Sequence, residues 1–130
     1  MADANIIVSA ILFPKSTIAN VLKHLIDNFS LVLSNYTIYE VEDVFNEKFP
    51  HGISEMKEFL QATPHELFTL NRINYKKYPS IRDIDDLPVL ANAIESKVDL
   101  LITGDKDFDG LMIKKPKIIK PRKYIDEYMK

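Results

Sequence analysis

The sequence predicts an α/β fold with a mainly parallel sheet covered by helices on both faces, and three observations support this. Short apolar runs alternate with longer segments of helical periodicity along the whole chain. One run, Leu100–Thr103, stops at Gly104, as is typical of a buried strand in a parallel sheet. The 130 residues and the 46% hydrophobic content suit one domain with its own core, which we expect to span residues 1–130.

The first half of the chain predicts helices with defined starting residues. Asp3 precedes the apolar run Ile6–Phe13, in which Ile7, Ala10 and Ile11 share one helical face. Ser16-Thr17 can cap a helix that ends near residue 29. Residues 31–33 suit a short strand, and Ser34 and Asn35 can cap the helix that follows it to about residue 48.

The first strand of the sheet is expected to be truncated. Only Met1 and Ala2 precede Asp3, which leaves almost nothing to form a strand before the first helix. A missing central strand would leave backbone groups of its neighbours unpaired. We therefore expect Asp3 to lie on a free terminus.

The middle of the chain predicts a further helix and strand, followed by an irregular segment. Ser54 is expected to open a helix to about Ala62, which Pro64 stops. Leu67–Leu70 is expected as a strand. Residues 71–85 show no clear period and end in an acidic turn.

The last third returns to alternating elements. Asp86 is a good N-cap, and Pro88 is tolerated in the first turn of the helix it would lead. The strand Leu100–Thr103 follows. Ile118-Ile119 predicts a last short strand, and Pro121 opens a terminal helix.

Four acidic residues lie at comparable points of this arrangement, where strands end or helices begin. They are Asp3, Glu40, Asp86 and Asp105, with Asp107 as a possible fifth. A parallel sheet brings such positions to one edge, where the carboxylates would repel one another without a cation. Oxygen ligands, in a chain with no Cys and three scattered His, suit Mg²⁺ or Mn²⁺. The chemistry that fits is metal-assisted phosphodiester hydrolysis, and the alternative for each acid is a solvated turn or helix face.

A basic segment near the C-terminus is a second candidate site. Its members are Lys114, Lys115, Lys117, Lys120, Arg122 and Lys123. Such a cluster could contact the phosphates of RNA. Lysines also protect an exposed edge strand from aggregation, and this alternative stays open.

Four stretches follow one another in an order that is typical of one family. They are Asp3–Ala10, Ser34–Glu40, Asp83–Leu90 and Thr103–Phe108. In these stretches the chain resembles the PIN-domain nucleases, in particular the bacterial PIN toxins of toxin–antitoxin systems. The resemblance implies a three-layer α/β/α fold and a Mg²⁺- or Mn²⁺-dependent endoribonuclease.

The resemblance also implies roles for individual residues. The catalytic acids fall on Asp3, Glu40, Asp86 and Asp105, and the metal ligands on Asp3, Asp86, Asp105 and Asp107. Asn5, Ser34 and Thr103 match polar positions that support the site. Asp83 or Asp85 could be mistaken for Asp86, but only Asp86 directly leads the apolar helix.

Partners and location are expected from the same resemblance and from composition. We expect an RNA substrate, a small antitoxin protein and a homodimer. The net charge of −2 means that any RNA contact comes from a local patch. The apolar run near the start is too short to span a bilayer and lacks the basic start of a signal peptide, so we expect a cytoplasmic protein without a membrane partner.

Two other functions compete with this interpretation. A degenerate PIN domain could bind RNA or a protein partner without cutting, as the short first strand suggests. A haloacid-dehalogenase-like phosphatase would match the run Gly104–Asp109. That class needs an Asp-x-Asp motif after its first strand, and here the second position is Asn5.

Overall fold

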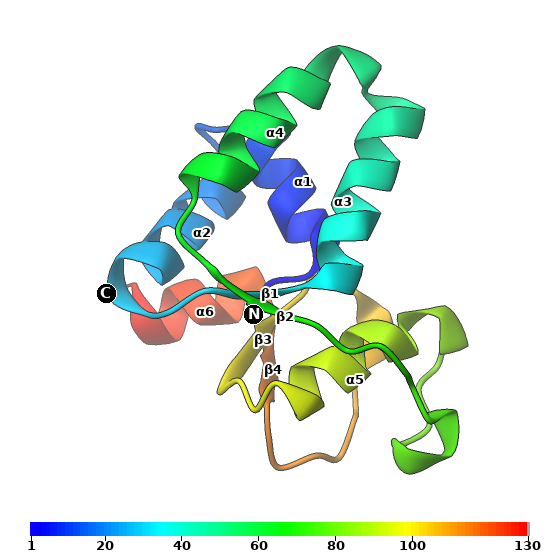
Figure 1. Cartoon of the computed structure of the whole chain (residues 1–130). Coiled ribbons are helices and arrows are strands. Elements are labelled where there is room, and N and C mark those ends of the chain that lie inside the picture. The colour runs from blue at the N-terminus through cyan, green and yellow to red at the C-terminus, as the bar shows by residue number, and fades with distance from the viewer. Residues whose placement is uncertain (130) are drawn as a thin grey trace.

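The structure is a computed structural model that describes residues 1–129, and it alternates helices with short strands (Figure 1). The elements in chain order are α1 (Ala4–Leu12), α2 (Thr17–Asn28), β1 (Val32–Ser34), α3 (Asn35–Lys48), η1 (Pro50–Gly52), α4 (Ile53–Ala62), β2 (Glu66–Phe68), η2 (Tyr75–Lys77), η3 (Ile84–Asp86), α5 (Leu87–Glu95), β3 (Leu100–Ile102), η4 (Lys106–Phe108), β4 (Lys117–Ile119) and α6 (Pro121–Tyr128). The elements labelled η are short 3₁₀ helices. This order confirms the predicted α/β class.

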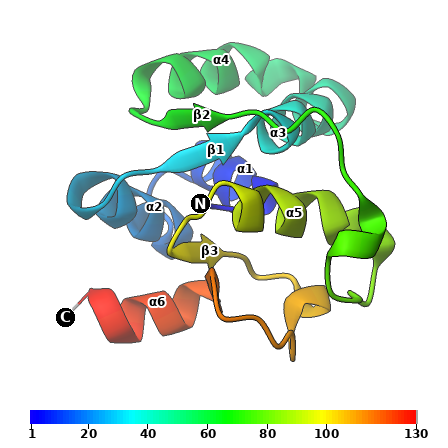
Figure 2. The same ribbon diagram turned by 60° about the horizontal axis from the view of Figure 1, so that its bottom comes forward.

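The strands pair in parallel, as predicted, but they form two separate pairs. β1 pairs with β2, and β3 pairs with β4. The N-terminus lies between the two pairs, and Figure 2 shows it between β1 and β3. Residues 1–3 therefore lie where the two halves of the sheet meet.

Residues Met1–Asp3 lie alongside β3. Ala2 makes an isolated parallel bridge with Ile102 of β3. The Met1 ammonium donates to the carbonyl of Leu100 at 2.9 Å. The Ile102 amide donates to the Met1 carbonyl at 2.9 Å, and the Asp3 amide donates to the Ile102 carbonyl at 2.9 Å. The expectation that Asp3 lies on a free terminus is therefore wrong, because these bonds fix Met1–Asp3 on β3.

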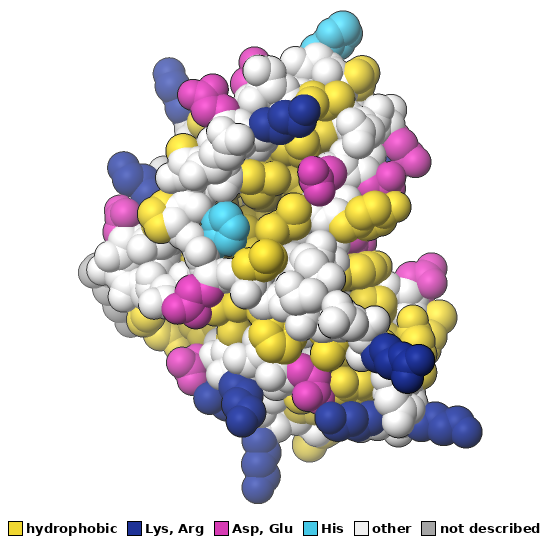
Figure 3. Space-filling view, in the orientation of Figure 1, with side chains coloured by type: hydrophobic (Ala, Val, Ile, Leu, Met, Phe, Trp, Pro, Cys, Tyr) yellow, Lys and Arg dark blue, Asp and Glu magenta, His cyan; other side chains and the backbone are white. Residues whose placement is uncertain are grey.

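The core lies on both faces of the sheet. Consecutive residues of β3 point to opposite faces, because side chains alternate along a strand. Ile102 packs in a cluster with α1, α2, α3 and α6, whereas Leu101 packs in a second cluster with α5 and Met1. Apolar side chains also gather over α4, α1 and α3 on the face shown in Figure 3.

Two boundaries differ from the sequence prediction. Ser54 does not cap α4, because η1 runs directly into this helix and Gly52 occupies the cap position without a side-chain bond. The strand expected at Leu67–Leu70 is β2 at Glu66–Phe68, whose place is set by the Glu66 amide donating to the Leu31 carbonyl at 2.9 Å. Leu67 is 60% exposed, so apolar character was a poor guide there.

No single helix among residues 1–129 is long and apolar enough to cross a membrane, although α1 and α2 pass by length and composition as a pair bent by 112°.

Candidate active site

Asp3 stands where the first strand ends and α1 begins. Its Oδ1 accepts from the Ala4 amide at 2.7 Å, so the side chain caps α1. Its Oδ2 accepts from the Thr103 hydroxyl at 2.8 Å. The residue is only 7% exposed. Both oxygens are therefore held in fixed directions at the edge of β3.

The loop after β3 brings Thr103, Asp105 and Asp107 to the same edge. The Thr103 hydroxyl donates to Asp3 and accepts from the Asp105 amide at 3.1 Å. Asp105 Oδ1 in turn accepts from the Asp107 amide at 2.9 Å, which caps η4. A chain of local bonds thus orders the loop, and the predicted supporting role of Thr103 has a structural basis.

Glu40 reaches the site from α3. Ser34 caps this helix, because the Thr37 amide donates to its Oγ at 3.0 Å. This cap fixes the start of α3 at the end of β1, so Glu40 lies one and a half turns into the helix. Oxygen Oε1 of Glu40 is buried and has no hydrogen-bond partner.

Asp86 and Asp83 come from the acidic turn before α5. Asp86 is the residue before α5, but its side chain makes no capping bond and remains available to the site. Carboxylate oxygens of Asp83, Asp86 and Asp107 all lie within 4.8 Å of one another. Asp83 is exposed, whereas Asp86 and Asp107 are half-buried.

The carboxyl groups raise the pKa values of one another. Burial, and then the charge of Asp3, raises the pKa of Glu40 to about 7. Burial, followed by the adjacent Asp107 and Asp105, raises the pKa of Asp86 to about 7. The pKa of Asp3 is also raised by burial, against the opposing hydrogen bond from Thr103. The protein thus holds more negative charge here than it can neutralise by itself.

These residues fit a divalent cation. The donors are all oxygens, three of them offer atoms within 4.8 Å of one another, and the buried Glu40 oxygen lacks a partner. A cation would relieve the repulsion between the carboxylates. Asp83, Asp86 and Asp107 offer the oxygens close enough to hold it, with Asp3, Glu40 and Asp105 as neighbouring carboxylates. The metal-ligand roles of Asp3 and Asp105 stay predictions.

The predicted residues do not all converge on this pocket. Asn5 is exposed on α1 and makes no side-chain hydrogen bond among the described residues, so its supporting role stays a prediction. Lys115 pairs with Asp99 at 3.2 Å, and Arg122 pairs with Asp126 at 3.6 Å. These two cations lie outside the hollow that Lys114, Lys117, Lys120 and Lys123 line.

Two residues of the site were not assigned from the sequence. Asp83 was considered only as a residue that could be mistaken for Asp86, yet it joins Asp86 in the cluster. The signal was their spacing of three residues, which places both on one turn of a 3₁₀ helix. Tyr36 is the other: burial, and then the charges of Glu40, Asp86 and Asp85, raises its pKa to about 12. It lies one turn before Glu40 on α3.

The comparisons with known proteins agree with this geometry. Residues 1–107 match the family model described as the PIN domain. A comparison with curated proteins gave no match. The matched region includes every carboxylate of the pocket, and ends before β4 and α6.

Proposed function

Because the chain belongs to the PIN-domain family, whose members have a three-layer α/β/α fold and are generally nucleases, we propose that it is a divalent-metal-dependent endoribonuclease. The nuclease fold and an acidic cluster are present. The use of Mg²⁺ or Mn²⁺ and the choice of RNA are the proposed parts.

The convergence of six carboxylates on one edge of the sheet is the observation that carries this proposal. They come from four separate parts of the chain: Asp3, Glu40, Asp83 with Asp86, and Asp105 with Asp107. A purely structural pocket would pair such groups with Lys or Arg. Among residues 1–129 the ion pair that reaches these carboxylates is the one from Arg82, at 3.9 Å from Asp107 and on the exposed side.

The carboxylates have different proposed roles in hydrolysis. Asp86 and Asp107, with Asp83, would hold the cation, because their oxygens lie within 4.8 Å of one another. Asp3 and Asp105 would complete the site, because local hydrogen bonds already fix their positions. When bound, the cation would supply a hydroxide at neutral pH and stabilise charge on the scissile phosphate. Glu40, with a pKa of about 7, can accept the proton of the attacking water near neutral pH.

Cleavage of a labelled RNA tests the proposal. We expect the purified chain to cut single-stranded RNA of mixed sequence with Mg²⁺ or Mn²⁺, and not with EDTA. Asp105→Asn and Asp86→Asn should abolish cutting, whereas Asp126→Asn, an exposed acid on α6, should cut normally. If wild-type protein binds metal but leaves a broad RNA panel intact, the non-cutting alternative replaces this proposal.

We also propose that the ribonuclease is a cytoplasmic toxin that a small antitoxin protein restrains, and that it forms a homodimer. The resemblance to PIN toxins supports this role. Induced expression should arrest growth, and Asp105→Asn should relieve the arrest. Normal growth with the intact protein would contradict the toxin role without bearing on the nuclease proposal. Sedimentation velocity would test the dimer.

A further inference from the structure

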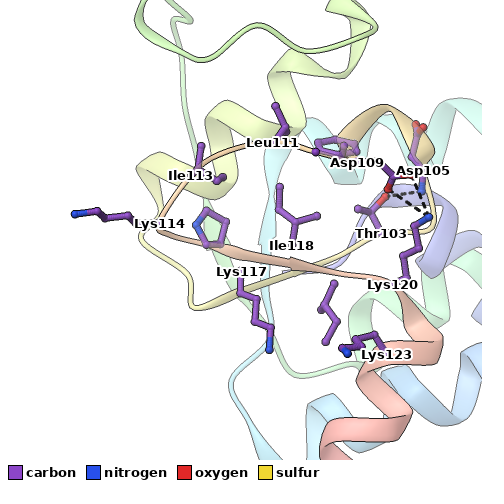
Figure 4. A pocket seen from close by; sticks show the side chains of 14 residues that line it. Thr103, Asp105, Asp109, Leu111, Ile113, Lys114, Lys117, Ile118, Lys120 and Lys123 are labelled. Carbon is purple, nitrogen blue, oxygen red and sulfur yellow. Dashed lines mark hydrogen bonds and ion pairs between the residues drawn. The ribbon is translucent and has the colours of Figure 1, made fainter.

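A hollow of about 600 Å³ lies beside the acidic pocket, along β4. It is bounded by β4, the loop 109–116 and the start of α6, and Thr103 and Asp105 line it as well as the acidic pocket. Figure 4 shows Lys120 pointing toward Asp109 and Asp105 at one end, and Lys114 projecting at the other. We name this hollow the β4 groove.

The rim of the β4 groove is cationic. Lys114, Lys117, Lys120 and Lys123 line it. Among the described residues Lys114 forms no ion pair, Lys120 lies 3.3 Å from Asp109, and Lys117 and Lys123 share Glu127 at 2.6 and 3.7 Å. These pairs are exposed and therefore weak, so a polyanion can displace the carboxylates.

The floor of the groove is apolar. Ile118 and Leu111 face one another across it in Figure 4, and Phe108 and Ile119 are buried beneath. An apolar floor with a cationic rim suits a chain that carries flat bases on one side and phosphates on the other. If the lysines only protected an exposed edge strand from aggregation, no hollow of about 600 Å³ would be needed beside that strand.

The length of the rim suits several nucleotides. Lys120 lies six positions after Lys114, and an extended chain of that length spans at most about 20 Å. The acidic pocket repels phosphates, so a substrate strand needs cations on at least one side of it. The β4 groove supplies four lysines, and Asp105 lines the same hollow.

We propose that the β4 groove binds single-stranded RNA and leads it to the acidic pocket, with Lys114 and Lys120 on its phosphates. This proposal rests on the proposed nuclease function for the identity of the ligand. The groove is built mainly from residues 108–123, which follow the region 1–107 that matches the family model.

Anisotropy of a fluorescein-labelled single-stranded RNA in EDTA, across a KCl series, tests the groove without cleavage. The double variant Lys114→Gln/Lys120→Gln should raise the Kd for RNA by about tenfold. It should also make the slope of log K against log salt less steep by about 1.4. The matched control is Lys48→Gln/Lys57→Gln, at exposed positions on α3 and α4, and it should bind as wild type does.

A change of the opposite sign sharpens the test. Asp109→Asn frees Lys120 and should tighten RNA binding about threefold, whereas Glu58→Gln on α4 should leave it unchanged. A purely structural role for Lys120 predicts no gain. Calorimetry with Mn²⁺ should give wild-type affinity in all these variants, which shows that the acidic pocket is intact.

The outcomes separate this proposal from the nuclease proposal. Wild-type RNA affinity and slope in the double lysine variant would overturn the groove, even if the protein cuts RNA. An equal loss in the α3–α4 control, or tighter binding of oligoglutamate than of RNA, would overturn it too. Loss of binding only in the groove variants, in a protein that never cuts RNA, would support the groove and contradict the nuclease.

Discussion

The acidic pocket has two parts that the fold treats differently. The inner carboxylates, Asp3, Glu40 and Asp105, come from a strand end, a capped helix and a hydrogen-bonded loop. The outer carboxylates, Asp83, Asp86 and Asp107, come from short 3₁₀ helices or the residue before one, and Asp83 is exposed. Core elements fix Asp3 and Glu40, and Asp105, although it precedes η4, is tied by its amide to Thr103 at the end of β3. The outer group is held mainly by local turns.

This difference indicates separate contributions to one site. Preorganised ligands cost little free energy to bring together when the cation binds. Ligands on short turns can adjust to the cation and to the substrate. We therefore expect a substitution in the inner group to cost more activity than one in the outer group.

Asp3→Asn is expected to have the largest effect. The change removes one negative charge from the site of the cation and weakens the hydrogen bond from Thr103, so RNA cleavage should fall by about a hundredfold or more. The melting temperature should change little, because Asn caps a helix about as well as Asp does. Initial cleavage rates and thermal melts measure the two effects. Near-normal cleavage would show that the inner group is not catalytic.

Asp83→Asn should reduce RNA cleavage less than Asp3→Asn does, because Asp83 belongs to the outer group. The residue is exposed, so we expect about a tenfold loss of cleavage and no change in melting temperature. The same assay with Asp85→Asn, an exposed neighbour in the turn, should show no loss. A loss for Asp83→Asn as large as that for Asp3→Asn would make the two groups equivalent.

The stability of the metal-free protein should fall as pH rises from about 4.5 to 7. The pKa values of Glu40 and Asp86 are raised to about 7 in the folded state, from their ordinary values of 4.5 and 3.8. The folded state therefore binds more protons than the unfolded state in this window, and stability is lost as they leave. Melts in EDTA at pH 5 and pH 8 measure this.

Glu40→Gln should flatten that pH dependence. The variant should be more stable than wild type at pH 8, because the repulsion is removed. Since Glu40 is only partly buried, we expect the free energy of unfolding to rise by about 1 kcal/mol, or the melting temperature by a few degrees. Glu42→Gln, an exposed acid on the same helix, is the control. If both variants keep the wild-type pH profile, the repulsion attributed to Glu40 is absent.

A change at the N-terminus, between the two strand pairs, is expected to have a smaller effect. A hollow of about 340 Å³ lies between Met1, Val32 and Val98, and burial lowers the pKa of the Met1 amine to about 6. A folded pKa below the unfolded value of 8.0 makes the amine cost stability below pH 8. Four apolar residues placed before Met1 would replace the amine by an amide and fill the hollow. They should raise the melting temperature by several degrees.

A Gly/Ser extension of the same length is the matched control for that change. It also replaces the amine but fills the hollow poorly, so it should give a smaller increase. If the two extended forms and the original melt together, the hollow has no part in stability.

Much of this pocket could be predicted from the sequence, because its residues sit where periodicity changes. Asp3 precedes an apolar helical run, and Asp105 follows an apolar strand, so each marks a boundary. Ser34 was predicted as a cap for the same reason, and the bond from Thr37 confirms it.

The remaining features depend on contacts that periodicity does not report. Asp83 joins the cluster through a 3₁₀ turn in a segment without a clear period. The anchoring of Met1–Asp3 depends on backbone bonds to β3, about a hundred residues away in sequence. The bounds of β2 depend on register, which an exposed strand with little apolar burial does not reveal.

Titration calorimetry with Mn²⁺ at pH 8 is the most direct test of the central claim, that carboxylates from both groups hold one cation site. We expect wild-type protein to bind Mn²⁺, Asp105→Asn and Asp86→Asn to weaken binding sharply, and Asp126→Asn to bind as wild type does. Unchanged binding in both Asp105→Asn and Asp86→Asn would contradict the site.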